Sequence, residues 1–278
     1  MEVFSSFACA QFFCGCAFFS LFYFGFFIFE SGWNCVAAGC AVYVCVDYGA
    51  FVYDAIVWAR RSGVNGMDIT IRLEEPADYR RVEEVQRDAF WDHHAPGCDE
   101  HYLAHCMRSH PDFIPELDFV ALVDGEIVGN IMYAKAALQN EQGERIPIVS
   151  FGPVGTRKSF QRKGVGTALI RHSLQKARDM GYPMVVIYGY PHDYCKHGFV
   201  GSKSLGISDT EGRFPVALLA YDLTGNWKVD GNWKYITSDI YLFDSDAAQA
   251  FDATFPPREK GYHTSQEEFR IACQAYVD

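Results

Sequence analysis

A short stretch in the middle of the chain has the residue types that bind a pyrophosphate at the start of a helix. Gln161-Arg162-Lys163-Gly164-Val165-Gly166 precedes a segment in which apolar residues recur at helical spacing between positions 169 and 177. The first backbone N–H groups of a helix have no intrahelical partner, and the helix dipole adds partial positive charge there. Such a turn therefore binds phosphate groups. Glycine lets the backbone approach the anion closely, and Arg162 and Lys163 add charge at its rim.

Two familiar nucleotide-binding loops do not fit these residues. A Walker loop needs Gly-Lys-Ser/Thr after a longer glycine spacing, which is absent here. The dinucleotide fingerprint needs a third glycine three residues after Gly166, which is absent here. The motif alone leaves two alternatives open, a phosphate-binding turn of another kind and a glycine turn that only starts a helix.

The elements that must position this loop follow from the pattern after Met67. We expect strands at 68–73, 119–123, 126–133, 146–156, 184–188 and 217–223, and helical segments at 74–90, 100–108, 164–180 and 193–197. Asp124-Gly125 suits a tight hairpin turn, and Gly152-Pro153 predicts a bulged or splayed strand. The order predicts an α+β fold in three layers, with a mixed, mostly antiparallel sheet and helices on both faces.

With its surroundings, the loop resembles a family motif. Gln161 to Leu169 resembles the Gln/Arg-x-x-Gly-x-Gly/Ala motif of the GNAT (Gcn5-related) N-acetyltransferase superfamily, and the expected strand order is similar too. Residues 151–154 and 194–199 look like the flanking signatures of that family. The resemblance covers residues 67–223 and is strongest to the subgroup of acetyltransferases typified by bacterial YhbS. It implies the acyl-CoA N-acyltransferase fold and acetyl-CoA as the acyl donor.

The resemblance also implies roles for individual residues. In the family, loop amides hold the CoA pyrophosphate, and the irregular strand before them pairs with the pantetheine arm. Ser159-Phe160 departs from the more usual Glu-Tyr before the motif, which bears on CoA affinity. The cofactor-binding residues implied in this way are Val154, Gly155, Thr156, Gln161, Arg162, Lys163, Gly164, Val165, Gly166 and Thr167.

Tyr194 stands at the position of the family's frequent general acid, which protonates the departing CoA sulfur. Family chemistry is direct transfer, so Cys195 is interpreted as a packed thiol. The residue that removes the proton of the amine is not identified. His192, Asp193 and the run Asp92-His93-His94 are candidates.

The same region contains residues that superficially resemble a metal site. His101 and His105 are four residues apart on an expected helix, which is a usable ligand spacing, and Asp99 and Glu100 lie beside them. The alternative is a polar loop followed by a solvated helix face. Nothing in the resemblance calls for a metal, and we expect none.

Composition restricts the partners. The 278 residues carry a formal net charge of -11, which argues against nucleic-acid binding and suits an amine acceptor, on a small molecule or a protein. Cysteines at positions 98, 106, 195 and 273 are widely scattered, which favours reduced thiols in a cytoplasmic protein. A catalytically silent acyl-CoA-binding module that regulates another protein is the alternative function.

The first 66 residues differ from the rest. They contain no Lys, and the uncharged run 5–29 is long enough to cross a bilayer. Its composition and flanks are unlike those of membrane helices or signal peptides, so we favour a translated upstream sequence with the true start at Met67, and keep a membrane anchor as the alternative. Residues 224–278 are expected to pack on the 67–223 domain, with a hairpin at 225–233 and a helix from Ser265. Covering the acceptor side and dimer contact are the alternative roles for them.

Overall fold

The computed structural model describes residues 67–228 and 231–278 in full, and before them only the backbone of short strands. The chain divides into two units, Met1–Arg61 and Ser62–Asp278. The first unit contains an antiparallel sheet with the order β1-β2-β3-β4-β5, formed by Ala10–Gln11, Phe18–Ser20, Phe26–Phe29, Trp33–Ala37 and Tyr43–Asp47. β6 (Ala59–Ser62) follows it.

The uncharged runs of the first unit lie largely outside the described residues. Whether the native chain starts at Met67 or carries an anchor therefore remains a prediction. Within the fully described ranges, no helix has both the length and the apolar character needed to cross a bilayer.

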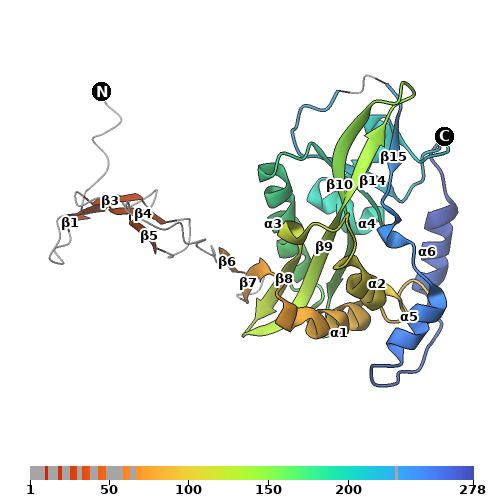
Figure 1. The fold of residues 1–278 in the computed structure, drawn as a ribbon, viewed down its shortest axis with the longest axis horizontal. Helices are drawn as coiled ribbons and strands as arrows, with labels where there is room; N and C mark the ends of the chain where they lie inside the picture. Colours follow the sequence, from red (N-terminus) through yellow and green to blue (C-terminus); the bar gives the residue numbers. More distant parts are fainter. Residues whose placement is uncertain are drawn as a thin grey trace. The chain divides into compact units, whose positions relative to one another are not determined.

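The second unit is built on a mixed sheet with the strand order β12-β14-β11-β10-β9-β8-β7 (Figure 1). Neighbouring strands along this order run antiparallel, except that β10 and β11 are parallel. This confirms the expected mixed, mostly antiparallel sheet. The strands are β7 (Asp68–Leu73), β8 (Phe119–Val123), β9 (Glu126–Gln139), β10 (Arg145–Thr156), β11 (Met184–Tyr188), β12 (Val200–Gly201) and β14 (Leu218–Asp222).

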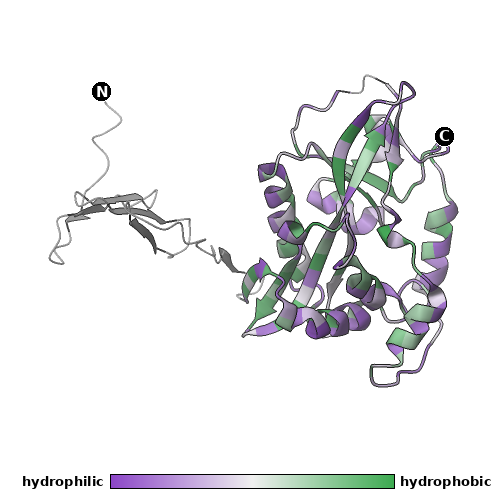
Figure 2. Ribbon diagram, viewed as in Figure 1, coloured by the Kyte–Doolittle hydropathy of each residue, from purple (hydrophilic) through white to green (hydrophobic). Residues whose placement is uncertain are grey.

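Helices cover both faces of this sheet, as expected. Successive strand residues point to opposite faces. Phe119 packs in the core that α3 (Val165–Asp179) covers, whereas its neighbour Val120 packs against Val82 and Val85 of α1 (Tyr79–Phe90). Figure 2 shows hydrophobic colouring along the central strands and hydrophilic colouring on much of the helical surface. The other helices are α2 (Glu100–Met107), α4 (Pro191–Tyr194), α5 (Ser245–Asp252) and α6 (Thr264–Gln274).

The irregularity that Gly152-Pro153 predicts is present in β10. The peptide bond between these residues is cis, and the register with β9 shifts between Phe151 and Val154. β10 and β11 are in register at Val149↔Val185, while β10 continues to Thr156 with β9 as its partner. The end of β10 therefore has one paired edge and one edge without a strand partner among the described residues.

The expected hairpin at 225–233 is wrong. β15 (Trp233–Ile236) instead pairs with β13 (Ile207–Ser208) in parallel and with β9 antiparallel. Burial of the β15 side chains explains the difference, because Trp233 and Tyr235 join a core cluster under the sheet and are only 5% and 3% exposed. The predicted C-terminal helix is confirmed as α6.

Candidate active site

The start of α3 presents backbone donors with no side-chain cap. Gly164 is the N-cap residue in a left-handed conformation, with φ of 95°, and its carbonyl accepts the N–H of Ala168 at 2.9 Å. No side chain caps the first turn. The N–H groups of Val165, Gly166 and Thr167 are therefore the free donors that an anion needs.

The loop before this helix is held by its own backbone and by one glutamine. Arg162 also has positive φ, 58°, so the chain reverses sharply twice before α3. Gln161 donates from Nε2 to the carbonyl of Thr156 at 3.1 Å, which ties the loop to the end of β10. Arg162 and Lys163 form no ion pair with the fully described residues, so their charge is not neutralised by a carboxylate of that part of the chain.

Two glycines allow this loop to sit close to the sheet. A Cβ at Gly155 would lie 2.2 Å from Gln86 Oε1 of α1, and a Cβ at Gly129 would lie 2.8 Å from Val165 Cγ1 of α3. Side chains there would push α1 or the start of α3 away from β9 and β10. Gly155 was among the predicted residues, but Gly129 was not. Nothing in its sequence surroundings indicates that a helix start packs on it.

Tyr194 ends α4 beside the open end of β10. Its half-buried ring packs against Phe151 and Phe199, with centroids 5.7 and 5.9 Å away. Burial raises the pKa of the Tyr194 hydroxyl above its ordinary value, and the charge of Asp193 adds to that effect. Among the described residues its hydroxyl has no hydrogen-bond partner.

Gly189 makes room for this ring. A Cβ at Gly189 would lie 2.3 Å from Tyr194 Cε2, closer than any real contact. The sequence analysis missed this residue, although a glycine directly after the buried strand 184–188 is a usable signal for close approach.

Cys195 is not a packed thiol. It is free and exposed, because Tyr194 takes the inward position at the end of α4 and the next side chain points out. His197 is half-buried, and burial lowers the pKa of its imidazole.

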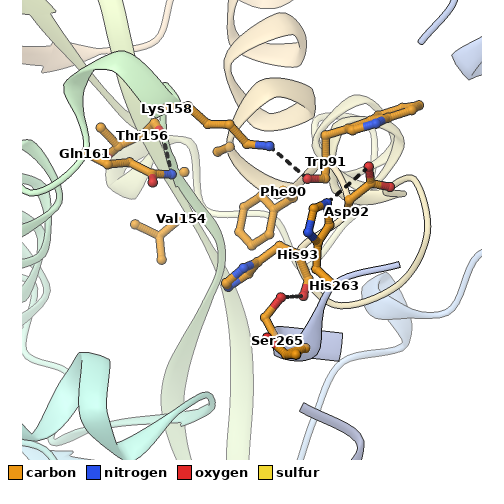
Figure 3. A pocket seen from close by; sticks show the side chains of 13 residues that line it. Phe90, Trp91, Asp92, His93, Val154, Thr156, Lys158, Gln161, His263 and Ser265 are labelled. Atoms are coloured by element: carbon orange, nitrogen blue, oxygen red, sulfur yellow. Dashed lines mark hydrogen bonds and ion pairs between the residues drawn. The ribbon is translucent and has the colours of Figure 1, made fainter. Parts of the chain in front are cut away.

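A cavity of about 460 Å³ lies beside the end of β10 (Figure 3). Val154, Gly155 and Thr156 form one side, together with Gln161. The opposite sides come from the end of α1 and the loop after it, residues 89–93, and from residues 263–265 at the start of α6. The cavity thus joins residues predicted for the acyl donor to His93, one of the candidates for the base.

The residues that superficially resemble a metal site do not come together into one cluster. His94 lies 3.2 Å from Glu100, while His105 lies 3.0 Å from Glu83, so these imidazoles have separate carboxylate partners. His101 is fully buried and lies 3.1 Å from Asp252 Oδ1. Within the described ranges, the residues whose ligand atoms lie within 4.8 Å of one another are instead His110, Asp112 and Asp239.

Comparison with known proteins gives one consistent family. Residues 70–200 match the family model of the acetyltransferase (GNAT) domain. Over 130 residues the chain is 26% identical to the uncharacterized N-acetyltransferase YjhQ of Escherichia coli, covering 47% of this chain and 68% of that protein. It is 27% identical to the uncharacterized N-acetyltransferase YhbS of Escherichia coli, covering 46% of this chain and 72% of the relative.

A solved structure shares the fold. The crystal structure of Escherichia coli YhbS in complex with CoA matches with a TM-score of 0.54 and 22% sequence identity. The match covers 64% of this chain and 93% of YhbS.

Proposed function

Because the chain carries an acetyltransferase domain of the GNAT superfamily, we propose that it transfers the acetyl group of acetyl-CoA directly to an amine. The observation that carries this proposal is the uncapped start of α3 next to the unpartnered end of β10. One feature suits a pyrophosphate and the other suits a peptide-like arm. The end of β10 and the start of α3 follow each other in the chain, just as the pantetheine arm and the pyrophosphate follow each other in CoA.

The donor would be held mainly by backbone groups. The amides of Val165, Gly166 and Thr167 would donate to the pyrophosphate, with Arg162 and Lys163 at its rim. The free edge of residues 154–156 would pair with the amides of the pantetheine arm. The solved structure of YhbS with CoA supports this arrangement, since that protein shares the fold.

Tyr194 would protonate the leaving group. In the reaction the amine nitrogen forms a bond to the thioester carbon, the carbon–sulfur bond breaks, and the sulfur leaves as a thiolate that needs a proton. A tyrosine hydroxyl is protonated at neutral pH, and burial, which raises the pKa of Tyr194, keeps it in that form. It also has no competing partner within the described part of the chain. It is therefore available to donate to the sulfur.

A thiol-detecting assay with a broad panel of amines tests the proposal. We expect acetyl-CoA to bind and free CoA to appear only when a suitable amine is present. Tight binding of acetyl-CoA in calorimetry with no CoA release across the panel would instead favour the acyl-CoA-binding regulatory module.

A further inference from the structure

The side of the cavity opposite the donor residues is closed by the C-terminal strap, which we define as residues 254–277. The strap lies outside residues 70–200 that match the family model. Its first contacts are with both ends of α1. Trp91 donates from Nε1 to the carbonyl of Glu259 at 2.9 Å, and Arg80 donates to the carbonyl of Thr254 at 2.7 Å.

The strap then crosses the cavity rim to the α4 side. The Phe269 ring stacks on His94, with centroids 4.1 Å apart. Tyr190, the N-cap of α4, donates its hydroxyl to the carbonyl of Ser265 at 3.2 Å. Beyond α6, Val216 donates its N–H to the carbonyl of Ala275 at 2.9 Å. The strap is thus attached on both sides of the cavity and forms one of its walls.

His93 is placed by this wall and by an unusual backbone conformation. Asp92 has φ of 60°, a left-handed conformation that is uncommon for a residue other than glycine and is frequent at functional sites. The strap holds the backbone on both sides of the Asp92–His93 peptide. Gln266, only 7% exposed, donates to the carbonyl of Asp92 at 3.1 Å, and Ser265 donates to the carbonyl of His93 at 3.0 Å.

The His93 ring extends from this turn toward Val154 on the donor side (Figure 3). His263, from the strap, points the other way, toward Asp92, with Nε2 and Oδ2 4.0 Å apart. His93 is therefore the imidazole that faces the place where donor and acceptor would meet.

We propose that this cavity is the acceptor site, that it accepts a small-molecule amine, and that His93 is the base that takes the proton from the attacking nitrogen. This inference rests on the proposed acetyl transfer. The bonds balance as follows: carbon–nitrogen forms, carbon–sulfur breaks, His93 receives the nitrogen's proton, and Tyr194 supplies the proton to sulfur.

The volume and the walls of the cavity favour a small-molecule acceptor over a lysine on a folded protein. The cavity of about 460 Å³ is in the size range of small-ligand sites, roughly 300–1,000 Å³, and the donor would fill part of it because residues 154–156 form one side. The strap limits approach from the side opposite β10. A lysine on a folded protein would have to bring its surroundings past residues 263–265, which are fixed beside the cavity by the hydrogen bond from Tyr190 to Ser265.

The charges around His93 favour the neutral imidazole that a base requires. Burial and the neighbouring His94 lower the pKa of His93, and Lys158 lowers it further. Asp193 and Glu100 act in the opposite direction but do not outweigh these effects. At neutral pH His93 is therefore unprotonated. It is suited to take a proton from nitrogen already bonded to the acyl carbon, because that nitrogen is a stronger acid than a free ammonium.

The first test is His93→Gln, which keeps a polar side chain but removes the titrating group. We expect kcat to fall about 100-fold to 10,000-fold, the usual range for loss of a general base. The fall of kcat/KM toward acidic pH should disappear with it, while the Kd for acetyl-CoA should stay within about twofold. The control is His110→Gln, which removes a histidine outside the cavity and should keep the wild-type pH profile.

The second test addresses the strap as a positioning element. Ser265→Ala removes the hydrogen bond to the carbonyl of His93 and should lower kcat several-fold with the Kd for acetyl-CoA unchanged. Phe269→Ala should loosen the wall and raise KM for the small amine more than it lowers kcat. Circular dichroism checks that both variants are folded.

Each failure can be recognised. If wild-type protein binds acetyl-CoA and releases no CoA with any amine, the proposed function fails. If wild-type protein is active and His93→Gln retains its rate and pH profile, only the assignment of the base fails. If a folded protein with exposed lysines is acetylated as efficiently as small amines, the assignment of acceptor size is overturned.

Discussion

Gly164 and Gly166 belong to the same loop, but the structure gives them different roles. Gly164 has φ of 95°, whereas Gly166 lies within the first turn of α3. A Cβ at Gly166 would meet only Thr156 Oγ1, at 3.7 Å, which is an ordinary contact. The same substitution to alanine should therefore have opposite effects at the two positions.

The cost at Gly164 comes from its backbone conformation. A residue with a Cβ is less stable in a left-handed conformation by about 1–2 kcal/mol. If the loop of Gly164→Ala keeps its shape, this cost lowers the free energy of unfolding, and the melting temperature falls by roughly 2–8 °C. If the loop relaxes instead, the amides leave their positions, and the affinity for acetyl-CoA falls by about 5-fold to 30-fold. The two losses together should amount to about 1–2 kcal/mol.

Gly166→Ala is the matched control. Alanine favours a helix over glycine by about 0.5–1 kcal/mol, so this variant should melt at the same or a higher temperature and bind acetyl-CoA normally. Thermal unfolding of both variants measures the change in stability, and titration calorimetry measures the change in affinity for acetyl-CoA. Unchanged stability and unchanged affinity in Gly164→Ala would refute the reasoning, as would a larger loss in Gly166→Ala.

Three further changes test other parts of the structure. Tyr194→Phe should lower kcat with little change in the Kd for acetyl-CoA, and unchanged turnover would remove Tyr194 from catalysis. Gly189→Ala should displace the Tyr194 ring, whose Cε2 would lie 2.3 Å from the new Cβ, and so lower kcat at least as much as Tyr194→Phe does. Acidification should weaken the packing of His101 against α5. Burial lowers the pKa of His101 to about 4 from 6.5, although the charge of Asp252 opposes this shift. As the pH falls, the unfolded state therefore binds a proton before the folded state does. The free energy of unfolding should fall by about 2 kcal/mol from pH 7 to pH 5. His101→Gln should remove this pH dependence when the free energy of unfolding is measured by urea titration at each pH.

The donor half of the site could be predicted from the sequence because its signals are local. The loop Gln161 to Gly166 combines the residues of a helix start with glycines whose need can be inferred from that turn alone. Gly152-Pro153 likewise predicted a break in β10, and the shift in register confirmed it. Hydrophobic patterns were sufficient to predict the main strands and helices of residues 67–223, because each is either amphipathic or, like β11, a short continuous apolar run.

The partners of the remaining residues depend on contacts between distant parts of the chain. Gly129 is needed only because α3 packs on it, and no neighbour in sequence indicates that contact. Gly189 follows a buried strand, which is a local signal, but only the folded structure shows that Tyr194 packs on it. The hairpin expected at 225–233 was wrong because burial of Trp233 under the sheet outweighs a local turn pattern.

The sequence by itself therefore determined the fold and the position of the candidate donor loop before α3, since both follow from local conformation and from the periodicity of apolar residues. Only the tertiary structure decided what stands opposite that loop. It separated His93 from the neighbouring histidines by turning the backbone at Asp92, and it brought the strap across the cavity. The physical reason is that hydrogen bonds and ring contacts between residues about 170 positions apart leave no pattern in the sequence.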